Sequence, residues 1–213
     1  MIKYNKIPNV FKRDTETNKL IEGEAISKEV DYLCCLTWVC TEKIDGTNIG
    51  IVWDGYRISY QGRTEKAQIP KHLLEKLEQL FGAKEEIFEQ MFGEKQVILF
   101  GEGFGYKIQN GGDYLGKEVD FILFDVYMPD EDIWLERDSI VDIADKLKIR
   151  VVPIVFKGSL PQAINYIKTM PESTIGKAKM EGIVAKPFIE MRDRRGNRIM
   201  VKIKCRDWKG EQE

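Results

Sequence analysis

The chain has 213 residues, enough to bury a substantial hydrophobic core without disulfide bonds or a structural metal. Hydrophobic residues make up 43% of the chain and charged residues 32%, which is typical of an ordinary soluble protein and excludes disordered and fibrous classes. The net charge of −2 at pH 7 gives no general indication of nucleic-acid binding.

Runs of β-branched and aromatic residues predict eight strands. In chain order these are residues 36–41, 47–53, 56–61, 96–101, 119–127, 150–156, 181–186 and 199–205. Asp54 and Gly55, between the second and third strands, indicate a two-residue hairpin turn.

Apolar spacing predicts three helices, at about residues 70–82, 138–147 and 159–168. Pro70 can open the first helix and Ser159 can cap the third. The apolar stripe of the first is expected to comprise Leu73, Leu74, Leu77, Leu80 and Phe81, and that of the second Ile140, Ile143, Ala144 and Leu147. Strands outnumber helices and do not alternate regularly with them, so the sequence predicts an α+β fold with antiparallel sheets.

Several classes of site and location find no support. No apolar run approaches the ~20 residues that a membrane helix needs, and residues 1–14 do not resemble a secretory signal, so we expect a cytoplasmic protein without membrane contact. Cys34, Cys35, Cys40 and Cys205 form no C-x-x-C pair, and we expect them to be small buried hydrophobic residues. With His72 as the single histidine, a zinc site has little support.

Two glycine-rich stretches do not qualify as phosphate-binding loops. Residues 111–117 have P-loop spacing up to the lysine, but Glu118 stands where the metal-binding hydroxyl belongs. Residues 101–105 resemble part of a dinucleotide loop but place Glu102 where a pyrophosphate would approach. No internal repeat or long linker divides the chain, so we expect a single domain over residues 1–213.

Positive charge gathers near the carboxyl end. Residues 192–209 hold eight basic residues against Asp193 and Asp207. Such a block indicates either a phosphate-facing surface or a solvated strand pair balanced by acidic residues elsewhere, and charge alone does not separate the two.

The strongest chemical signal lies in residues 41–48. Lys43 follows a hydrophobic strand and is itself followed by Asp45 and Gly46, which predicts that its amine lies in a turn at a sheet edge. A lysine becomes a nucleophile once it loses its proton, which burial or nearby positive charge favours. A short K-x-D-G motif also occurs by chance, with a solvated turn lysine as the alternative.

Five segments, taken in order, resemble the motifs of the covalent nucleotidyltransferases, the superfamily of ATP-dependent ligases and mRNA capping enzymes. They are residues 43–46, 100–102, 121–125, 181–186 and 201–204. Residues 42–48 are most similar to phage-type ATP-dependent RNA ligases of the second family.

The resemblance implies a nucleotidyltransferase domain in which two antiparallel sheets line a nucleotide cleft with flanking helices. It also implies that ATP donates AMP to Lys43 with the help of Mg²⁺ or Mn²⁺, and that RNA 5′-phosphate and 3′-hydroxyl ends are then joined. The nucleotide-binding residues implied are Glu42, Lys43, Asn48, Arg63, Glu102, Phe124, Lys186, Lys202 and Lys204, and the implied metal ligand is Glu181.

Strand alternation adds a test of these roles. Lys202 and Lys204 are two residues apart and share one face of their strand, where they can neutralise a triphosphate. Glu181 and Lys186 are five apart, so strict alternation places them on opposite faces and a shared face needs a bend or bulge.

Two alternatives stay open: a GTP-dependent mRNA capping guanylyltransferase, and an RNA- or nucleotide-binding module without turnover. Only nine residues follow Lys204, so we expect no carboxy-terminal OB-fold or helical domain. A partner protein could supply such a domain for RNA engagement.

Overall fold

The computed structural model describes residues 1–64, 66–109 and 112–208, which form two compact units. Unit 1 comprises Met1–Tyr4 and Asp45–Val152, and unit 2 comprises Asn5–Ile44 and Pro153–Glu213. The segment around Lys43 therefore contributes to both: its lysine ends a strand of unit 2, and its glycine belongs to unit 1. Among the residues described, no helix is both long and apolar enough to cross a membrane.

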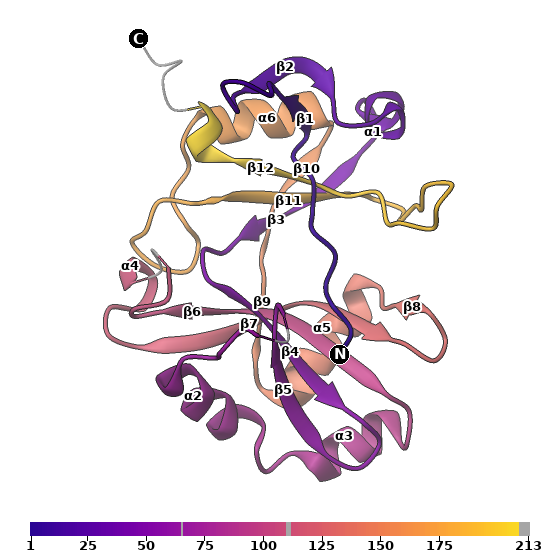
Figure 1. Ribbon diagram of the computed structural model, residues 1–213, viewed down its shortest axis with the longest axis vertical. Coiled ribbons are helices and arrows are strands. Elements are labelled where there is room, and N and C mark those ends of the chain that lie inside the picture. Colours follow the sequence, from indigo (N-terminus) through magenta and orange to yellow (C-terminus); the bar gives the residue numbers. More distant parts are fainter. Residues whose placement is uncertain (65, 110–111, 209–213) are drawn as a thin grey trace. The chain divides into compact units, whose positions relative to one another are not determined.

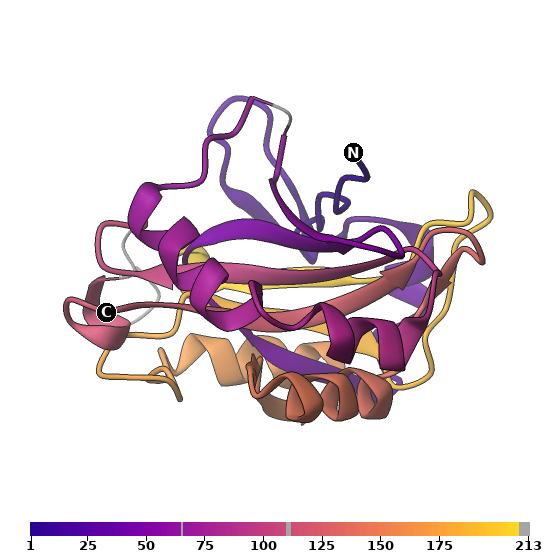
Figure 2. The same ribbon diagram turned by 90° about the horizontal axis from the view of Figure 1, so that it is seen from below.

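Unit 1 is built on one largely antiparallel sheet in the order β5-β4-β6-β7-β8, with β9 paired in parallel to β7. The strands are β4 (Thr47–Trp53), β5 (Ile58–Gly62), β6 (Val97–Gly105), β7 (Val119–Met128), β8 (Ile133–Trp134) and β9 (Arg150–Val151). The helices are α2 (Lys71–Phe81), α3 (Glu85–Phe92), α4 (Gly112–Leu115) and α5 (Arg137–Leu147). Apolar side chains of α2, α3 and α5 cover one face of the sheet, along which α2 and α3 follow one another (Figure 2).

Unit 2 contains a four-stranded antiparallel sheet in the order β10-β3-β11-β12 (Figure 1). Its strands are β10 (Ile154–Gly158), β3 (Trp38–Lys43), β11 (Gly182–Pro187) and β12 (Val201–Lys204), and a separate hairpin joins β1 (Phe11–Arg13) to β2 (Leu20–Ala25). The helical elements are α1 (Lys28–Leu33), α6 (Leu160–Lys168) and the short 3-10 helix η1 (Cys205–Trp208). The inner faces of α6 and the four strands form a second hydrophobic core, which leaves the other face of the sheet to polar side chains.

Most predicted elements are confirmed within a few residues, and the α+β class with antiparallel sheets is correct. Ser159 caps α6 in a full capping box. The apolar stripe of α5 is buried as expected, whereas Leu74 in α2 is 37% exposed because it lies about 100° round the helix from Leu73.

Three expectations about strands were wrong. The single strand expected at 150–156 is divided into two strands, β9 and β10, because Pro153 has no amide hydrogen to continue the ladder. The hairpin at Asp54 has a four-residue loop, since Trp53 pairs with Ile58 and the Asp54 carboxylate accepts bonds from two loop amides. The strand expected at 36–41 is displaced to 38–43, so Lys43 ends a strand lying between two others rather than standing in an edge turn.

The sequence patterns missed β1, β2, β8, α1, α3 and α4, which are short or have weak periodicity.

The expectation that all four cysteines are buried was half right. Cys40 and Cys205 are buried, but Cys34 is half-buried and Cys35 is exposed at the end of α1. Cys34 still packs against the core of unit 2, whereas Cys35 does not.

Candidate active site

Two lysines and a glutamate meet on the polar face of the sheet in unit 2. The Lys43 Nζ lies 2.7 Å from the Glu181 Oε2, and the Lys204 Nζ lies 2.5 Å from the Glu181 Oε1. Each carboxylate oxygen therefore receives one ammonium group. Side-chain exposures of 23% for Lys43, 16% for Glu181 and 14% for Lys204 leave the group partly open to a ligand.

The register of the sheet brings these residues together. Gly182 in β11 is the partner of Lys43 in β3 on one side and of Lys204 in β12 on the other. A Cβ on Gly182 would stand 2.1 Å from the Ile203 carbonyl oxygen, so only glycine fits. Gly182, at φ +156°, is the first residue of β11, and Glu181 immediately before it directs its carboxylate to the two lysines.

The contacts of Glu181 show which face it shares with Lys186. Ile183 and Ala185 point into the core of unit 2, so Lys186 lies on the opposite, polar face. Glu181 reaches that face from its position outside the regular strand, as the shared role of Glu181 and Lys186 required. Lys186 forms an ion pair with Glu190 at 3.4 Å.

Charge and burial act in opposite directions at Glu181. Burial raises the pKa of its carboxyl, but the Lys43 and Lys204 ammonium groups outweigh that effect and hold the pKa below its ordinary value. Glu181 is therefore a carboxylate at neutral pH. This agrees with the expectation that a carboxylate in an apolar strand region must be paired.

Lys202 is the exception among the basic residues of this face. Burial, followed by the Lys204, Lys43 and Lys6 ammonium groups, lowers the pKa of Lys202 to about 8. An anion that binds beside Lys202 would stabilise its charged form. The polar face thus holds concentrated positive charge that a single carboxylate only partly neutralises.

Glu42 has different surroundings, although it adjoins Lys43. Alternation along β3 turns it to the core side, where it is 1% exposed. Its carboxylate accepts hydrogen bonds from the Ser173 hydroxyl at 2.5 Å and from the Thr174 backbone amide at 2.9 Å. These contacts, which the sequence did not indicate, fix the loop that precedes β11. A nucleotide contact for Glu42 stays a prediction.

Unit 1 gathers a second set of the predicted residues. Asn48 in β4 is the cross-strand partner of Glu102 in β6, on the sheet face opposite the helices. Gly46 shows why the motif needs glycine, because a Cβ there would stand 2.3 Å from the Gly103 carbonyl oxygen. Arg63 lies exposed just beyond β5.

Phe124 is half-buried in β7, and Tyr4 packs against it with 5.0 Å between ring centroids. The Tyr4 hydroxyl donates to the buried Asp125 carboxylate at 2.6 Å, and the Tyr4 ring also contacts Phe100. Tyr4 was missed by the sequence reasoning. The only available signal was a buried aspartate in the strand that carries Phe124, which needs a hydrogen-bond donor.

A divalent ion at this site would need oxygen donors such as carboxylates. Within the described residues, no group of three His, Cys, Asp or Glu side chains could hold a metal. Mg²⁺ and Mn²⁺ are commonly held by one or two carboxylates together with substrate phosphates and water, so Glu181 fits as the protein's contribution to such a site. Glu181 could not supply a metal site alone.

The basic residues of the block at 192–209 have different environments. Arg192 and Arg198 form an antiparallel bridge, and Arg198 pairs with Glu190. Arg194 and Arg195 are exposed on the turn between them. Lys209 lies outside the described residues.

The fold described here is the nucleotidyltransferase domain seen in RNA ligases. A model of the family described as RNA ligase matches residues 36–204, and the chain belongs to that family. The match includes parts of both units and every predicted site residue. We found no curated protein sequence significantly similar to this chain.

Solved structures of an RNA ligase of Naegleria gruberi share this fold. A variant with AMP and Mn aligns with a TM-score of 0.69 and 20% identity over 95% of this chain and 56% of the other. A variant with ATP and Mn aligns with a TM-score of 0.68 and 19% identity over 95% of this chain and 56% of the other. A structure with PPi aligns with a TM-score of 0.65 and 20% identity over 86% of this chain and 54% of the other. At this identity the likeness establishes the fold. The chain spans little more than half the length of these proteins.

Proposed function

We propose that this protein is an ATP-dependent RNA ligase that uses Lys43 as its nucleophile. The observation that carries the proposal is the meeting of Lys43, Glu181 and Lys204 on one polar sheet face, in a chain of the RNA ligase family. A lysine held at the end of a strand beside further positive charge suits attack on a phosphate. The ATP, AMP and Mn of the Naegleria structures support the same choice of nucleotide and metal.

The reaction has three steps. The Lys43 Nζ, after losing its proton, bonds to the α-phosphorus of ATP while the bond from that phosphorus to pyrophosphate breaks. An oxygen of an RNA 5′-phosphate then bonds to the AMP phosphorus, which releases Lys43. Finally a 3′-hydroxyl attacks the activated 5′-phosphate, AMP leaves with the bonding electrons, and the strand is sealed.

The residues of unit 2 have distinct tasks in the first step. The Lys43 amine must lose its proton and its 2.7 Å contact with Glu181 before it can attack. Lys202 and Lys204 place positive charge where the negative charge of the phosphates must be offset. Glu181 would hold Mg²⁺ or Mn²⁺, an ion that supplies further electrostatic stabilisation of the phosphates when bound.

The remaining nucleotide-binding roles come from the family resemblance. Contacts of Asn48, Arg63, Glu102 and Phe124 with the nucleoside, and of Lys186 with phosphate, are proposals of this kind. The facing pair of Asn48 and Glu102 supports them by placing two polar side chains together on the sheet face opposite the helices. A cytoplasmic location, and a partner protein that supplies further RNA contacts, also stay proposals.

Covalent labelling tests the proposed function. Incubation with α-labelled ATP and Mg²⁺ should add the mass of one AMP through an acid-labile, alkali-stable bond at Lys43. Lys43→Ala should remain unlabelled, while Lys179→Ala, an exposed lysine of the same unit, should label normally. Label from GTP exceeding that from ATP would instead favour a capping guanylyltransferase, and no label from either would favour a binding module.

A further inference from the structure

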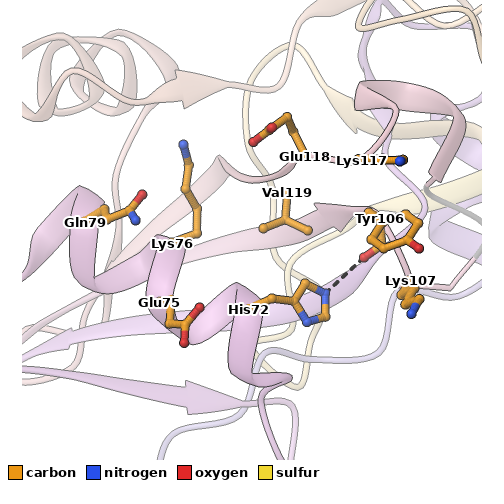
Figure 3. A pocket seen from close by; sticks show the side chains of 9 residues that line it. All are labelled: His72, Glu75, Lys76, Gln79, Tyr106, Lys107, Lys117, Glu118 and Val119. Carbon is orange, nitrogen blue, oxygen red and sulfur yellow. Dashed lines mark hydrogen bonds between the residues drawn. The ribbon is translucent and has the colours of Figure 1, made fainter.

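A cavity of about 450 Å³ lies in unit 1, away from the residues assigned above. It opens beside α2, the end of β6 and the start of β7 (Figure 3). His72 and Lys76 line it from α2, and Tyr106, Lys107, Lys117 and Glu118 line it from the chain that follows β6 and precedes β7. Its volume lies in the range of small-molecule sites.

The cavity lining has a small excess of positive charge, since Lys76, Lys107 and Lys117 face Glu75 and Glu118. Lys107 and Lys117 are both exposed, and neither has a carboxylate within 4.0 Å among the residues that the structure describes. Lys76 reaches Asp120 only at 3.9 Å. An anion that entered the cavity would therefore meet ammonium groups that no salt bridge already engages at short range.

Tyr106 has a fixed backbone and a partly exposed ring. The His72 Nε2 donates to the Tyr106 carbonyl oxygen at 3.0 Å, and the Tyr106 amide donates to the Glu118 carbonyl oxygen at 2.9 Å. The preceding Gly105, at φ +115°, packs so closely that a Cβ would stand 2.3 Å from that same Glu118 oxygen. The tyrosine remains 38% exposed, with the Lys107 Nζ 5.1 Å from its ring centroid.

We propose that this cavity binds one ribonucleotide unit of the RNA strand, with the base stacked on Tyr106 and the phosphates beside Lys107 and Lys117. An exposed aromatic ring flanked by lysines is the combination that binds single-stranded RNA with little sequence preference. The Glu118 carboxylate can accept a hydrogen bond from a ribose hydroxyl. The inference rests on the proposed function, since it names where unit 1 holds the RNA that the ligase would join.

The test is the binding of a 5′-phosphorylated single-stranded RNA 12-mer, measured by fluorescence anisotropy over a salt series. The double change Lys107→Ala with Lys117→Ala should weaken binding at least about fivefold at low salt and reduce the salt slope by 1 to 2. Tyr106→Leu should weaken binding by about fivefold or more with an unchanged slope, because it removes stacking and no charge.

The matched control is Lys95→Ala with Lys146→Ala, which removes the same charge from exposed sites of unit 1 outside the cavity. This control should bind within about twofold of the unaltered protein. Equal effects of the two double variants would overturn the inference, because binding would then follow net charge. Melting temperatures identify any variant that loses its fold, in which case Lys117→Gln alone is measured in its place.

A photocrosslink distinguishes RNA from a free nucleotide. RNA that carries 4-thiouridine should crosslink to the peptide containing Tyr106, and millimolar AMP should not remove the crosslink. Loss of the crosslink to AMP would overturn the inference in favour of a mononucleotide site. Lysyl-AMP formation by the unaltered protein is measured separately, so that failure of the proposed function and failure of the cavity assignment give different results.

Discussion

Lys43 and Glu181 are 138 residues apart in the sequence, and their side chains form a 2.7 Å salt bridge. Lys204 reaches the other oxygen of the same carboxylate. The negative group therefore holds the nucleophile in place and is itself held by a second lysine. Changes to each partner should have distinguishable effects.

Removing the carboxylate should disable the first reaction step. Glu181→Ala should lower the rate of lysyl-AMP formation at least about a hundredfold, because the metal contact and the anchor of Lys43 are both lost. Lys204→Ala should cause a similar loss by removing positive charge from the phosphates. Raised Mn²⁺ should partly restore Glu181→Ala in a label-transfer assay and should not restore Lys204→Ala. Equal restoration of both would contradict this division of roles.

Lys202 should make stability depend on pH. Its pKa of about 8 in the folded protein lies below the ordinary value of 10.5, so between these values the unfolded chain binds more protons and stability rises with pH. Below pH 8, the folded protein carries the cost of a partly buried ammonium. Lys202→Met should therefore raise the melting temperature at pH 7, and the gain should shrink as the pH approaches 10. A gain of the same size at both pH values would show that burial of charge is not its cause.

The same lysine should link ATP binding to pH. Above pH 8 a neutral Lys202 must take up a proton to meet a phosphate, so affinity for a non-cleavable ATP analogue should fall by at most about tenfold per pH unit. Lys202→Arg keeps its charge and should flatten this decline. Calorimetry between pH 7 and 10 measures both. A decline in Lys202→Arg as steep as in the unaltered protein would assign it to another group.

Glu42 should matter for stability because its buried carboxylate holds Ser173 and Thr174. Glu42→Ala leaves these polar groups without their acceptor and should lower the free energy of unfolding by about 3 kcal/mol in urea denaturation. The control is Glu172→Ala, which breaks an exposed salt bridge in the same loop and should cost less than about 1 kcal/mol. Similar costs for the two would deny Glu42 this structural role.

The exposed turn between Arg192 and Arg198 offers a test of the basic block. Arg194→Ala with Arg195→Ala should reduce sealing of pre-adenylylated RNA, and the deficit should be greatest at low ionic strength, where phosphate contacts are strongest. Sealing assays from 25 to 200 mM salt provide the measurement. Unchanged sealing across that range would place the RNA away from this turn.

Chain-local patterns predicted much of the fold. Alternation placed Lys202 and Lys204 on one face with Val201 and Ile203 on the other, and helical spacing placed Ile140 and Leu147 in the core. These features depend on neighbours within one strand or helix, so the sequence states them directly. The ordered motifs, in turn, identified the family that the comparison confirmed.

Only the tertiary structure decided which distant residues meet. The strand ending at Lys43 extends past its predicted limit because Glu42 and Lys43 pair with β11, far along the chain. Ser173 and Thr174 then satisfy the buried Glu42 carboxylate. Glu181 reaches Lys43 and Lys204 because Gly182 allows β12 to approach closely enough to exclude any side chain. The Tyr4 hydroxyl likewise donates a hydrogen bond to Asp125, which is 121 residues away in the sequence. The contacts of Lys43 and Lys204 with Glu181 depend on strand register between remote segments, whereas Tyr4 and Ser173 reach their partners from outside the strands. Both kinds of contact are set by the packing of whole sheets and not by any local pattern.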